Sequence, residues 1–128
     1  MKCKIFFLLI MVFFSCNIKQ EEIPGTYISK NQINNIDTLR IFSDGTYEKK
    51  VYKKSDNSLI FHNTGGWNYK EGRITFKDFF YDNDEIFSKD FKNFKDILIT
   101  SSFTVEREAG KISIEFLEDK AQFRYNKL

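Results

Sequence analysis

The chain has 128 residues, of which 20 are basic and 18 acidic, and its formal net charge is +2. This length allows one domain with a single hydrophobic core and is too short for two. The charge balance excludes the basic field that nucleic-acid binding needs, so no nucleic-acid partner is expected. The cysteines are Cys3 and Cys16, and the remaining chain offers no thiol for a disulfide, a nucleophile or a zinc site.

Residues 1–15 have the pattern of a secretory signal peptide. Lys2 and Lys4 precede an apolar run over residues 5–14, which is shorter than the roughly 20 residues that span a bilayer. The pair Ser15-Cys16 that follows resembles the lipobox of bacterial lipoproteins. The resemblance implies that the signal is removed and that Cys16 is acylated. Cys16 would then hold the protein on the outer membrane of the cell envelope.

Residues 16–24 are predicted to form a polar tether. They contain the cluster Lys19-Gln20-Glu21-Glu22, which resembles the surface-export signal of lipoproteins in some Gram-negative bacteria. A solvated linker is the equal alternative, so exposure at the cell surface stays open. Pro24-Gly25 marks the start of the folded domain, predicted over residues 25–128.

From residue 25 onward, apolar and polar residues alternate with the period of two that is typical of half-buried strands. Turn-forming clusters such as Ser43-Asp44-Gly45 separate the alternating stretches. The glycine pair Gly65-Gly66 lies inside one long stretch and indicates a bulge or a barrel corner. The predicted strands cover residues 25–29, 36–42, 46–53, 58–70 and 73–79, and three more follow around residues 97–105, 112–116 and 121–125.

Eight strands joined mainly by tight turns predict an all-β, antiparallel, up-and-down barrel, with an open sandwich as the alternative. The segments Gly25-Thr26-Tyr27, Asp44-Gly45-Thr46-Tyr47 and Gly66-Trp67 resemble the lipocalin-like small lipoproteins. That resemblance implies a lipocalin-like barrel. Residues 82–95 break the alternation, and Phe87, Phe91 and Phe94 have helical spacing. We interpret this stretch as a loop with a short helix that covers the core.

No catalytic constellation emerges, so we expect neither an enzyme nor a cofactor, and we expect a monomer. His62 is the only histidine, and strand phase points it outward. The acidic run at residues 82–85 lacks the glycine and the distant glutamate of a calcium loop, and no metal site is predicted. Glu106 and Glu108 share a face beside a turn, where surface charge is the preferred interpretation over acid–base chemistry.

Two polar residues, Lys49 and Ser101, fall on the inward face. A bulge or a snorkelling stem would explain Lys49, as would a wet cavity, because an eight-stranded barrel can hold one small ligand. A small, partly apolar ligand, with an acidic head such as that of a fatty acid, is one functional hypothesis. A protein-interaction or inhibitor domain with a filled barrel is the other. The predicted ligand-binding residues are Tyr47, Lys49, Trp67, Tyr69, Ser101 and Phe103.

Overall fold

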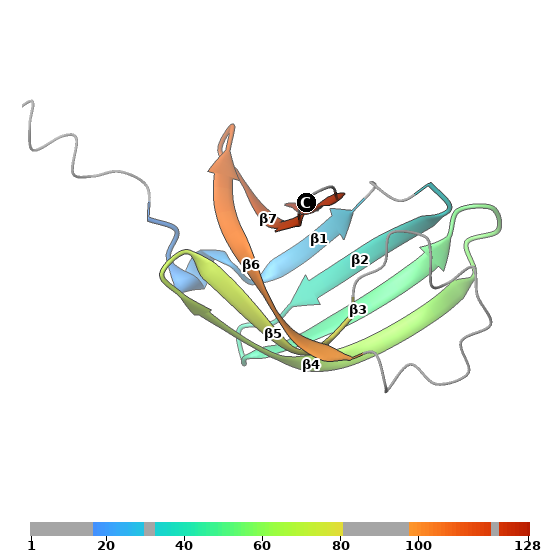
Figure 1. Ribbon diagram of the computed structural model, residues 1–128, viewed down its shortest axis with the longest axis horizontal. Coiled ribbons are helices and arrows are strands. Elements are labelled where there is room, and N and C mark those ends of the chain that lie inside the picture. Colours follow the sequence, from blue (N-terminus) through green and yellow to red (C-terminus); the bar gives the residue numbers. More distant parts are fainter. Residues whose placement is uncertain (1–16, 30–32, 81–97, 119–120) are drawn as a thin grey trace, which may run out of the picture.

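The computed structural model describes residues 17–29, 33–80, 98–118 and 121–128, and it forms one closed barrel of eight antiparallel strands (Figure 1). Each strand pairs with the next along the chain, and β1 pairs with β8 to close the sheet. The predicted up-and-down barrel is confirmed, and the open sandwich is wrong. The strands are β1 (Gly25–Ser29), β2 (Asn35–Ile41), β3 (Thr46–Lys53), β4 (Leu59–Lys70), β5 (Arg73–Phe79), β6 (Ile99–Glu108), β7 (Lys111–Glu118) and β8 (Ala121–Lys127).

The alternation of the sequence predicted these elements well, because each strand has one face in the barrel core. The bounds of β1, β3 and β5 agree with the prediction, and those of β2 and β4 differ by one residue. The segment over residues 82–95, including Phe87, Phe91 and Phe94, lies outside the described residues, so its predicted helix stays a prediction.

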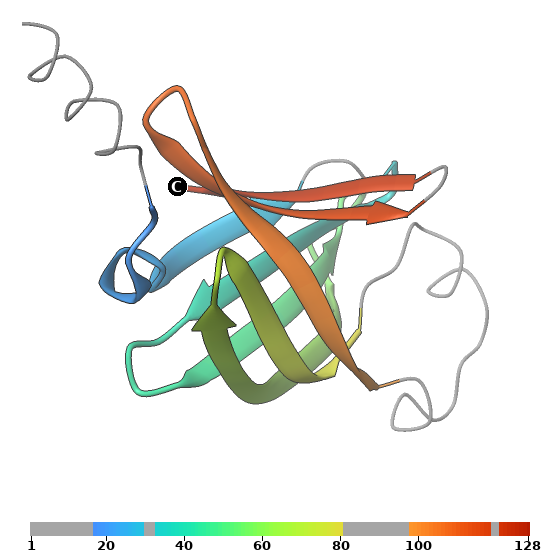
Figure 2. The same cartoon turned by 60° about the vertical axis from the view of Figure 1, so that its left-hand side comes forward.

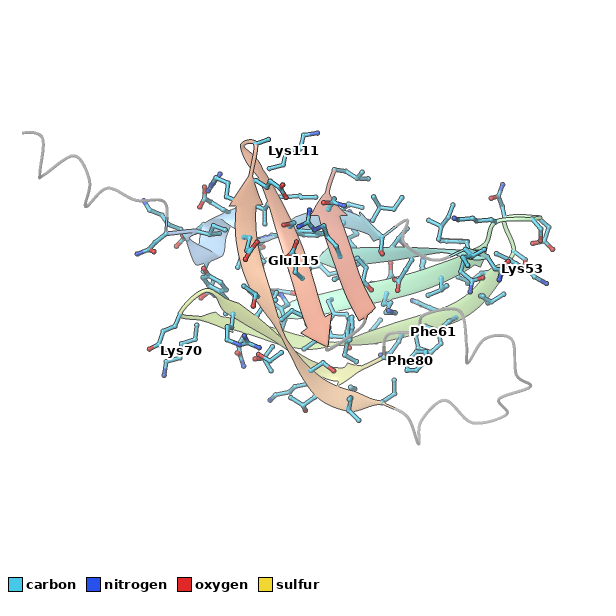
Figure 3. The ribbon with its side chains drawn as sticks, turned by 45° about the horizontal axis from the view of Figure 1, so that its top comes forward. Lys53, Phe61, Lys70, Phe80, Lys111 and Glu115 are labelled. Atoms are coloured by element: carbon cyan, nitrogen blue, oxygen red, sulfur yellow. The ribbon has the colours of Figure 1, made fainter. Side chains whose placement is uncertain are left out.

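The two ends of the barrel differ, and we name them by their connections. The capped end carries the turns at residues 42–45, 71–72 and 109–110, together with the N-terminal segment 17–24 (Figure 2). The distal end carries the end of β1, the turn at residues 54–58 and the start of β6. In Figure 3, Lys70 and Lys111 lie toward the capped end, whereas Lys53 lies toward the distal end.

The centre of the barrel is packed with aromatic rings. Tyr47, Phe76, Phe79, Phe103 and Tyr125 form a chain of ring contacts with centroid separations of 4.8–6.5 Å. Such contacts stabilise a core beyond the area they bury. A smaller cluster of Val51, Phe61 and Phe80 lies toward the distal end, and Figure 3 shows the last two side by side.

A bulge in β5 turns Phe79 into this core, where strict alternation from Phe76 would point it outward. The register shifts between Phe76 and Phe79, and Asp78 has a φ of 55°. The Tyr47 hydroxyl lies 2.7 Å from the carbonyl of Lys77 and 2.9 Å from that of Asp78. A Cβ at Gly65 would lie 2.4 Å from the Lys77 carbonyl, so the glycine in β4 permits this close approach.

Two apolar residues are exposed although they share the parity of inward-facing residues on their strands. Leu59 is 50% exposed and Ile99 is 58% exposed. Each is the first residue of its strand at the distal end, where the barrel wall is no longer backed by the core. Alternation predicts which face a residue shares, but it does not say where along the strand burial ends.

The described part of the predicted tether, residues 17–24, packs against the barrel. Ile18 and Ile23 are buried in the main core, and Gln20–Glu22 forms a short 3-10 helix. Strand side chains bind its main chain: Tyr69 Oη donates to the carbonyl of Ile18 at 2.8 Å, and Tyr27 Oη donates to that of Ile23 at 2.6 Å. This segment is therefore a cap docked on the barrel and not a free tether, and the role of its exposed residues 19–21 stays a prediction.

Candidate functional site: a buried polar cluster inside the barrel

The most unusual chemistry in the described residues is an ion pair inside the barrel. Lys49 on β3 is fully buried, and its ammonium donates to Asp37 Oδ2 on β2 at 2.6 Å. The same ammonium donates to Tyr125 Oη on β8 at 2.9 Å. It also lies 4.7 Å from the centre of the Phe79 ring, within the range of a cation–π interaction. We call Asp37, Lys49 and Tyr125 the polar cluster.

Strand register explains how the cluster forms. Lys49 pairs with Leu39, whereas Asp37 pairs with Val51, so the lysine and the aspartate are diagonal neighbours across β2 and β3. Long side chains reach such a neighbour readily. The ladder from Thr46 to Val51 is regular, and no bulge diverts Lys49. Of the explanations considered for this residue, the bulge and the snorkelling stem are therefore wrong.

The electrostatics of the cluster follow from its burial. Removing an ion pair from water is expensive, and close hydrogen-bonded partners offset that cost only in part. Burial raises the pKa of the Tyr125 hydroxyl well above its ordinary value, and the nearby charge of Asp37 raises it further. Tyr125 is therefore a neutral phenol that accepts from the ammonium. The opposite charges of Lys49 and Asp37 leave the cluster without net charge.

Other polar side chains are buried on the inward faces of their strands. Ser29, Asn35 and Ser101 are buried at 0%, 4% and 6% exposure. Ser29 pairs with Asp37 in the sheet and so lies beside the cluster. Among the residues that the structure describes, neither the Ser29 nor the Ser101 hydroxyl has a hydrogen-bond partner. Buried hydroxyls are normally paired, so these two are positions where a ligand or a water would be stabilised.

The six predicted ligand-binding residues do not form one site. Lys49 and Ser101 face the polar part of the interior, and Phe103 packs against Phe79 next to it. Tyr47 packs on Phe79 in the centre of the barrel, whereas Trp67 and Tyr69 lie nearer the capped end, and the polar atoms of all three are already engaged by main-chain carbonyls. The Tyr47 hydroxyl donates to the Lys77 carbonyl at the β5 bulge. The Trp67 indole N–H donates to the Phe42 carbonyl at 2.8 Å, and the Tyr69 hydroxyl donates to the Ile18 carbonyl at 2.8 Å.

Sequence reasoning missed Asp37, the residue that neutralises Lys49. The signal was present, because Asp37 shares the parity of Leu39 and Ile41 and therefore had to face inward. Two inward residues of opposite charge on adjacent strands predict a pair once the register is known. The register itself could not be read from the alternation, since a shift of two residues preserves the face.

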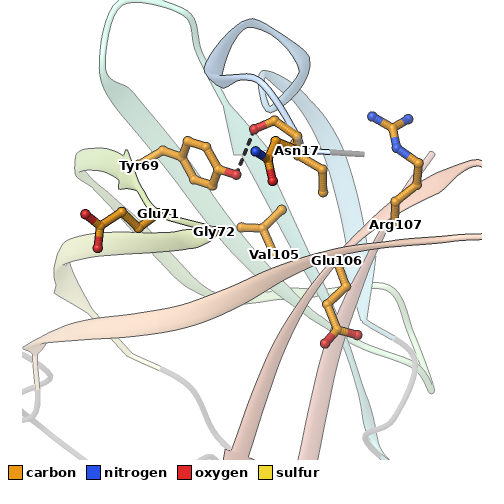
Figure 4. A pocket seen from close by; sticks show the side chains of 8 residues that line it. Asn17, Tyr69, Glu71, Gly72, Val105, Glu106 and Arg107 are labelled. Atoms are coloured by element: carbon orange, nitrogen blue, oxygen red, sulfur yellow. Dashed lines mark hydrogen bonds between the residues drawn. The ribbon is translucent and has the colours of Figure 1, made fainter. Parts of the chain in front are cut away.

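A surface pocket of about 580 Å³ lies at the capped end, outside the barrel interior (Figure 4). Asn17 and Ile18 form one side of it, and Glu106 and Arg107 from β6 form another. Arg107 also pairs with Glu22 at 2.8 Å, which joins the cap to the barrel wall. The pocket belongs to the junction between the cap and the strands.

The other residues considered for chemistry lie on the outside. His62 is exposed and interacts with Glu48 Oε2 at 3.1 Å, and Glu106 is exposed. Glu108 is exposed and pairs with Arg124 at 2.8 Å. Within the described residues, no group of three or more potential metal ligands comes together. None of the helices in that part of the chain has the length and apolar character needed to cross a membrane.

Comparison with known proteins adds no relative: no family model, no curated protein and no solved structure matches the chain.

Proposed function

We propose that the protein is a bacterial envelope lipoprotein, anchored to the outer membrane through Cys16, whose barrel binds one small amphiphilic ligand at the polar cluster. The eight-stranded barrel is consistent with a lipocalin-like ligand-binding fold, since barrels of this size can hold one small molecule. The observation that carries the proposal is the buried Lys49–Asp37–Tyr125 cluster, together with the hydroxyl of Ser29 beside it and that of Ser101 on the inward face of β6, which have no hydrogen-bond partner among the described residues.

A purely structural barrel gains little from such a cluster. Well-packed apolar side chains of similar volume stabilise a core as well as a buried ion pair does, and often better. Polar groups retained in an apolar interior are typical of binding sites, where a few of them orient a ligand. The surrounding rings of Phe79 and Phe103 supply the apolar contact that the tail of an amphiphile needs.

The charge of the cluster favours a ligand with a neutral polar head. Lys49 alone would favour a carboxylate, but Asp37 already balances its charge. A fatty-acid carboxylate in this place would add a buried negative charge without a matching cation. A hydroxyl or amide head can exchange hydrogen bonds with Ser29 and Ser101 without that penalty. Monoacylglycerols and fatty amides are therefore better first probes than fatty acids.

The ligand proposal is tested with a soluble form of the chain that begins at Asn17. We expect saturable binding of a monoacylglycerol at one molecule per chain, measured by native mass spectrometry and by calorimetry. Ser101→Ala should weaken it about tenfold, the effect of losing one hydrogen bond. Ser102→Ala is the matched control, because the adjacent serine faces outward. Equal affinity in wild type and Ser101→Ala, or equal loss in both variants, would contradict the assignment.

The anchor is tested separately. Cys16→Ser should leave the chain unprocessed or release it from the membrane fraction, and a variant that remains in membranes at the mature size would refute lipidation.

For the export signal, Glu21→Ala is the cleanest change. The main-chain N–H of Lys19 donates to the Glu22 carboxylate at 2.9 Å, so changes at Glu22 would also disturb the cap. Loss of protease accessibility on intact cells would support a sorting role for Glu21.

A second function has its own supporting observation. Three of the four exposed large apolar side chains in the described residues, Ile33, Leu59 and Ile99, are between 50% and 82% exposed and lie at the distal end, whereas Leu128 lies at the capped end. Exposed apolar residues that gather at one end of a molecule favour contact with another protein. The alternative proposal is thus an interaction or inhibitor domain that meets its partner at the distal end. Leu59→Ser with Ile99→Ser would abolish partner binding in that case and leave monoacylglycerol binding unchanged.

A further inference from the structure

We infer that the barrel stands with its capped end against the membrane that carries its anchor, and with its distal end pointing away. The inference rests on the proposed acylation of Cys16. It goes beyond it, because a lipid anchor by itself does not orient a protein. The orientation follows from how the cap is bound to the barrel.

The spacer between the anchor and the folded domain is a single residue. Asn17 alone separates Cys16 from Ile18, which is buried in the barrel core. Consecutive Cα atoms are about 3.8 Å apart, so Ile18 lies within roughly 8 Å of the anchored residue. A strand of eight residues, such as β3, is about 27 Å long. When the barrel stands upright with its capped end at the headgroups, its distal end is about one strand length away from them.

The cap resists being pulled out of the barrel. Tyr27 and Tyr69 bind its carbonyls, and Lys127 Nζ donates to the carbonyl of Glu22 at 2.6 Å. Arg107 pairs with the Glu22 side chain at 2.8 Å. A flexible nine-residue tether would have an end-to-end distance of about 17 Å and would let the barrel turn freely. The docked cap removes nearly all of that freedom.

The surfaces of the two ends agree with this orientation. Exposed residues around the capped end include Lys19, Lys70 and Lys111 along with Glu21 and Glu71, which suit a polar headgroup layer. Of the exposed large apolar residues in the described part of the chain, Ile33, Leu59 and Ile99 are at the other end, and Leu128 is at the capped end. Held away from the bilayer, the first three face the aqueous compartment. The polar part of the barrel interior, beside Ser29 and Asp37, also lies on that side.

The test places one reporter at each end of the full lipidated protein. Ser43→Cys and Ser55→Cys are matched sites, since both serines are exposed residues in hairpin turns, one at the capped end and one at the distal end. The mature chain has no other free thiol once Cys16 is acylated. Each variant is labelled with an environment-sensitive fluorophore and incorporated into vesicles of phosphatidylethanolamine and phosphatidylglycerol. A fraction of the lipid carries a nitroxide on its headgroup.

We expect the Ser43 label to be quenched about threefold or more strongly than the Ser55 label, since quenching needs contact within the short reach of the spacer. Eight Gly and Ser residues inserted between Cys16 and Asn17 should reduce that difference, because they restore a flexible tether. Equal quenching of the two labels, or stronger quenching at Ser55, would overturn the orientation. Flotation of the same samples tests the anchor alone. Protein that does not float with the vesicles refutes the acylation, whereas floating protein with equal quenching refutes only the orientation.

Discussion

The part of the barrel interior next to the cap is apolar, whereas the part farther along the strands holds both a polar cluster and the apolar group of Val51, Phe61 and Phe80, although the same eight strands build both. Toward the capped end, Ile23 closes the core, and the polar atoms of Trp67 and Tyr69 are bound by main-chain carbonyls. Toward the distal end, an ion pair and two unpaired hydroxyls lie among aromatic rings. The part next to the cap has the composition of a stabilising core, whereas the other part retains buried polar side chains that stability does not require.

The largest effect is expected from separating the members of the ion pair. Lys49→Met should destabilise the barrel by about 3–5 kcal/mol, because it leaves the Asp37 carboxylate buried without its cation. The double variant Lys49→Met with Asp37→Leu should recover most of that loss while abolishing ligand binding. Urea unfolding measures the first quantity and calorimetry the second. A double variant as unstable as the single one would mean that the polar part is also a structural necessity.

Lys50→Met is the control for the lysine change. Lys50 is adjacent in sequence but points outward, and its ammonium is 3.5 Å from Glu48 at the surface. A surface pair of this kind contributes about 0–1 kcal/mol, so the free energy of unfolding should change little. A large loss of unfolding free energy in Lys50→Met would show that β3 tolerates substitution poorly in general. The effect of Lys49→Met could then not be assigned to the ion pair.

A smaller effect is expected at the capped end from Trp67→Phe. The indole N–H donates to the Phe42 carbonyl at 2.8 Å, and the side chain is only 8% exposed. The variant keeps an aromatic ring but removes this donor, so the Phe42 carbonyl retains only the Gly45 N–H at 3.4 Å, and the lost hydrogen bond costs about 1 kcal/mol. Ligand affinity should not change, since Trp67 belongs to the apolar part. Loss of affinity together with stability would show that the two parts of the interior are coupled.

The smallest effect concerns the cap and depends on pH. The main-chain N–H of Lys19 and the guanidinium of Arg107 hold the pKa of Glu22 below its ordinary value. A carboxyl group with a depressed folded pKa stabilises the fold above its unfolded pKa of about 4.3, and this contribution is lost as the pH falls through the lower folded value. Glu22→Gln should remove this acid dependence. Hydrogen exchange at the amide of Ile23 measures it, and an identical acid response in wild type and variant would contradict the assignment.

Period-two alternation was sufficient to predict the strands, because in a closed barrel every strand has one face in the core. It failed where a single residue breaks the period. Asp78 adopts a left-handed conformation, and the bulge that it forms turns Phe79 inward. The cap was missed for another reason: Ile18 and Ile23 are isolated apolar residues in a polar stretch, and nothing periodic marks them as core.

The candidate site was predictable in part. Strand phase placed Lys49 and Ser101 inside, and the structure keeps both there. It could not distinguish them from Trp67, which shares the inward face but lies toward the opposite end of the barrel. The position of a residue along the barrel axis depends on strand register and tilt, and the alternation of the sequence contains no information on either.

The way in which the barrel binds its cap affects which substitutions the N-terminal segment tolerates during evolution. Tyr27, Tyr69 and Lys127 bind carbonyl oxygens, which every amino acid possesses. Docking therefore places few demands on the side chains of residues 19–21, which are exposed. Natural selection for an export signal can therefore change these side chains without disturbing the fold that they precede. If the proposed export signal is present, one short segment both holds it and closes the barrel.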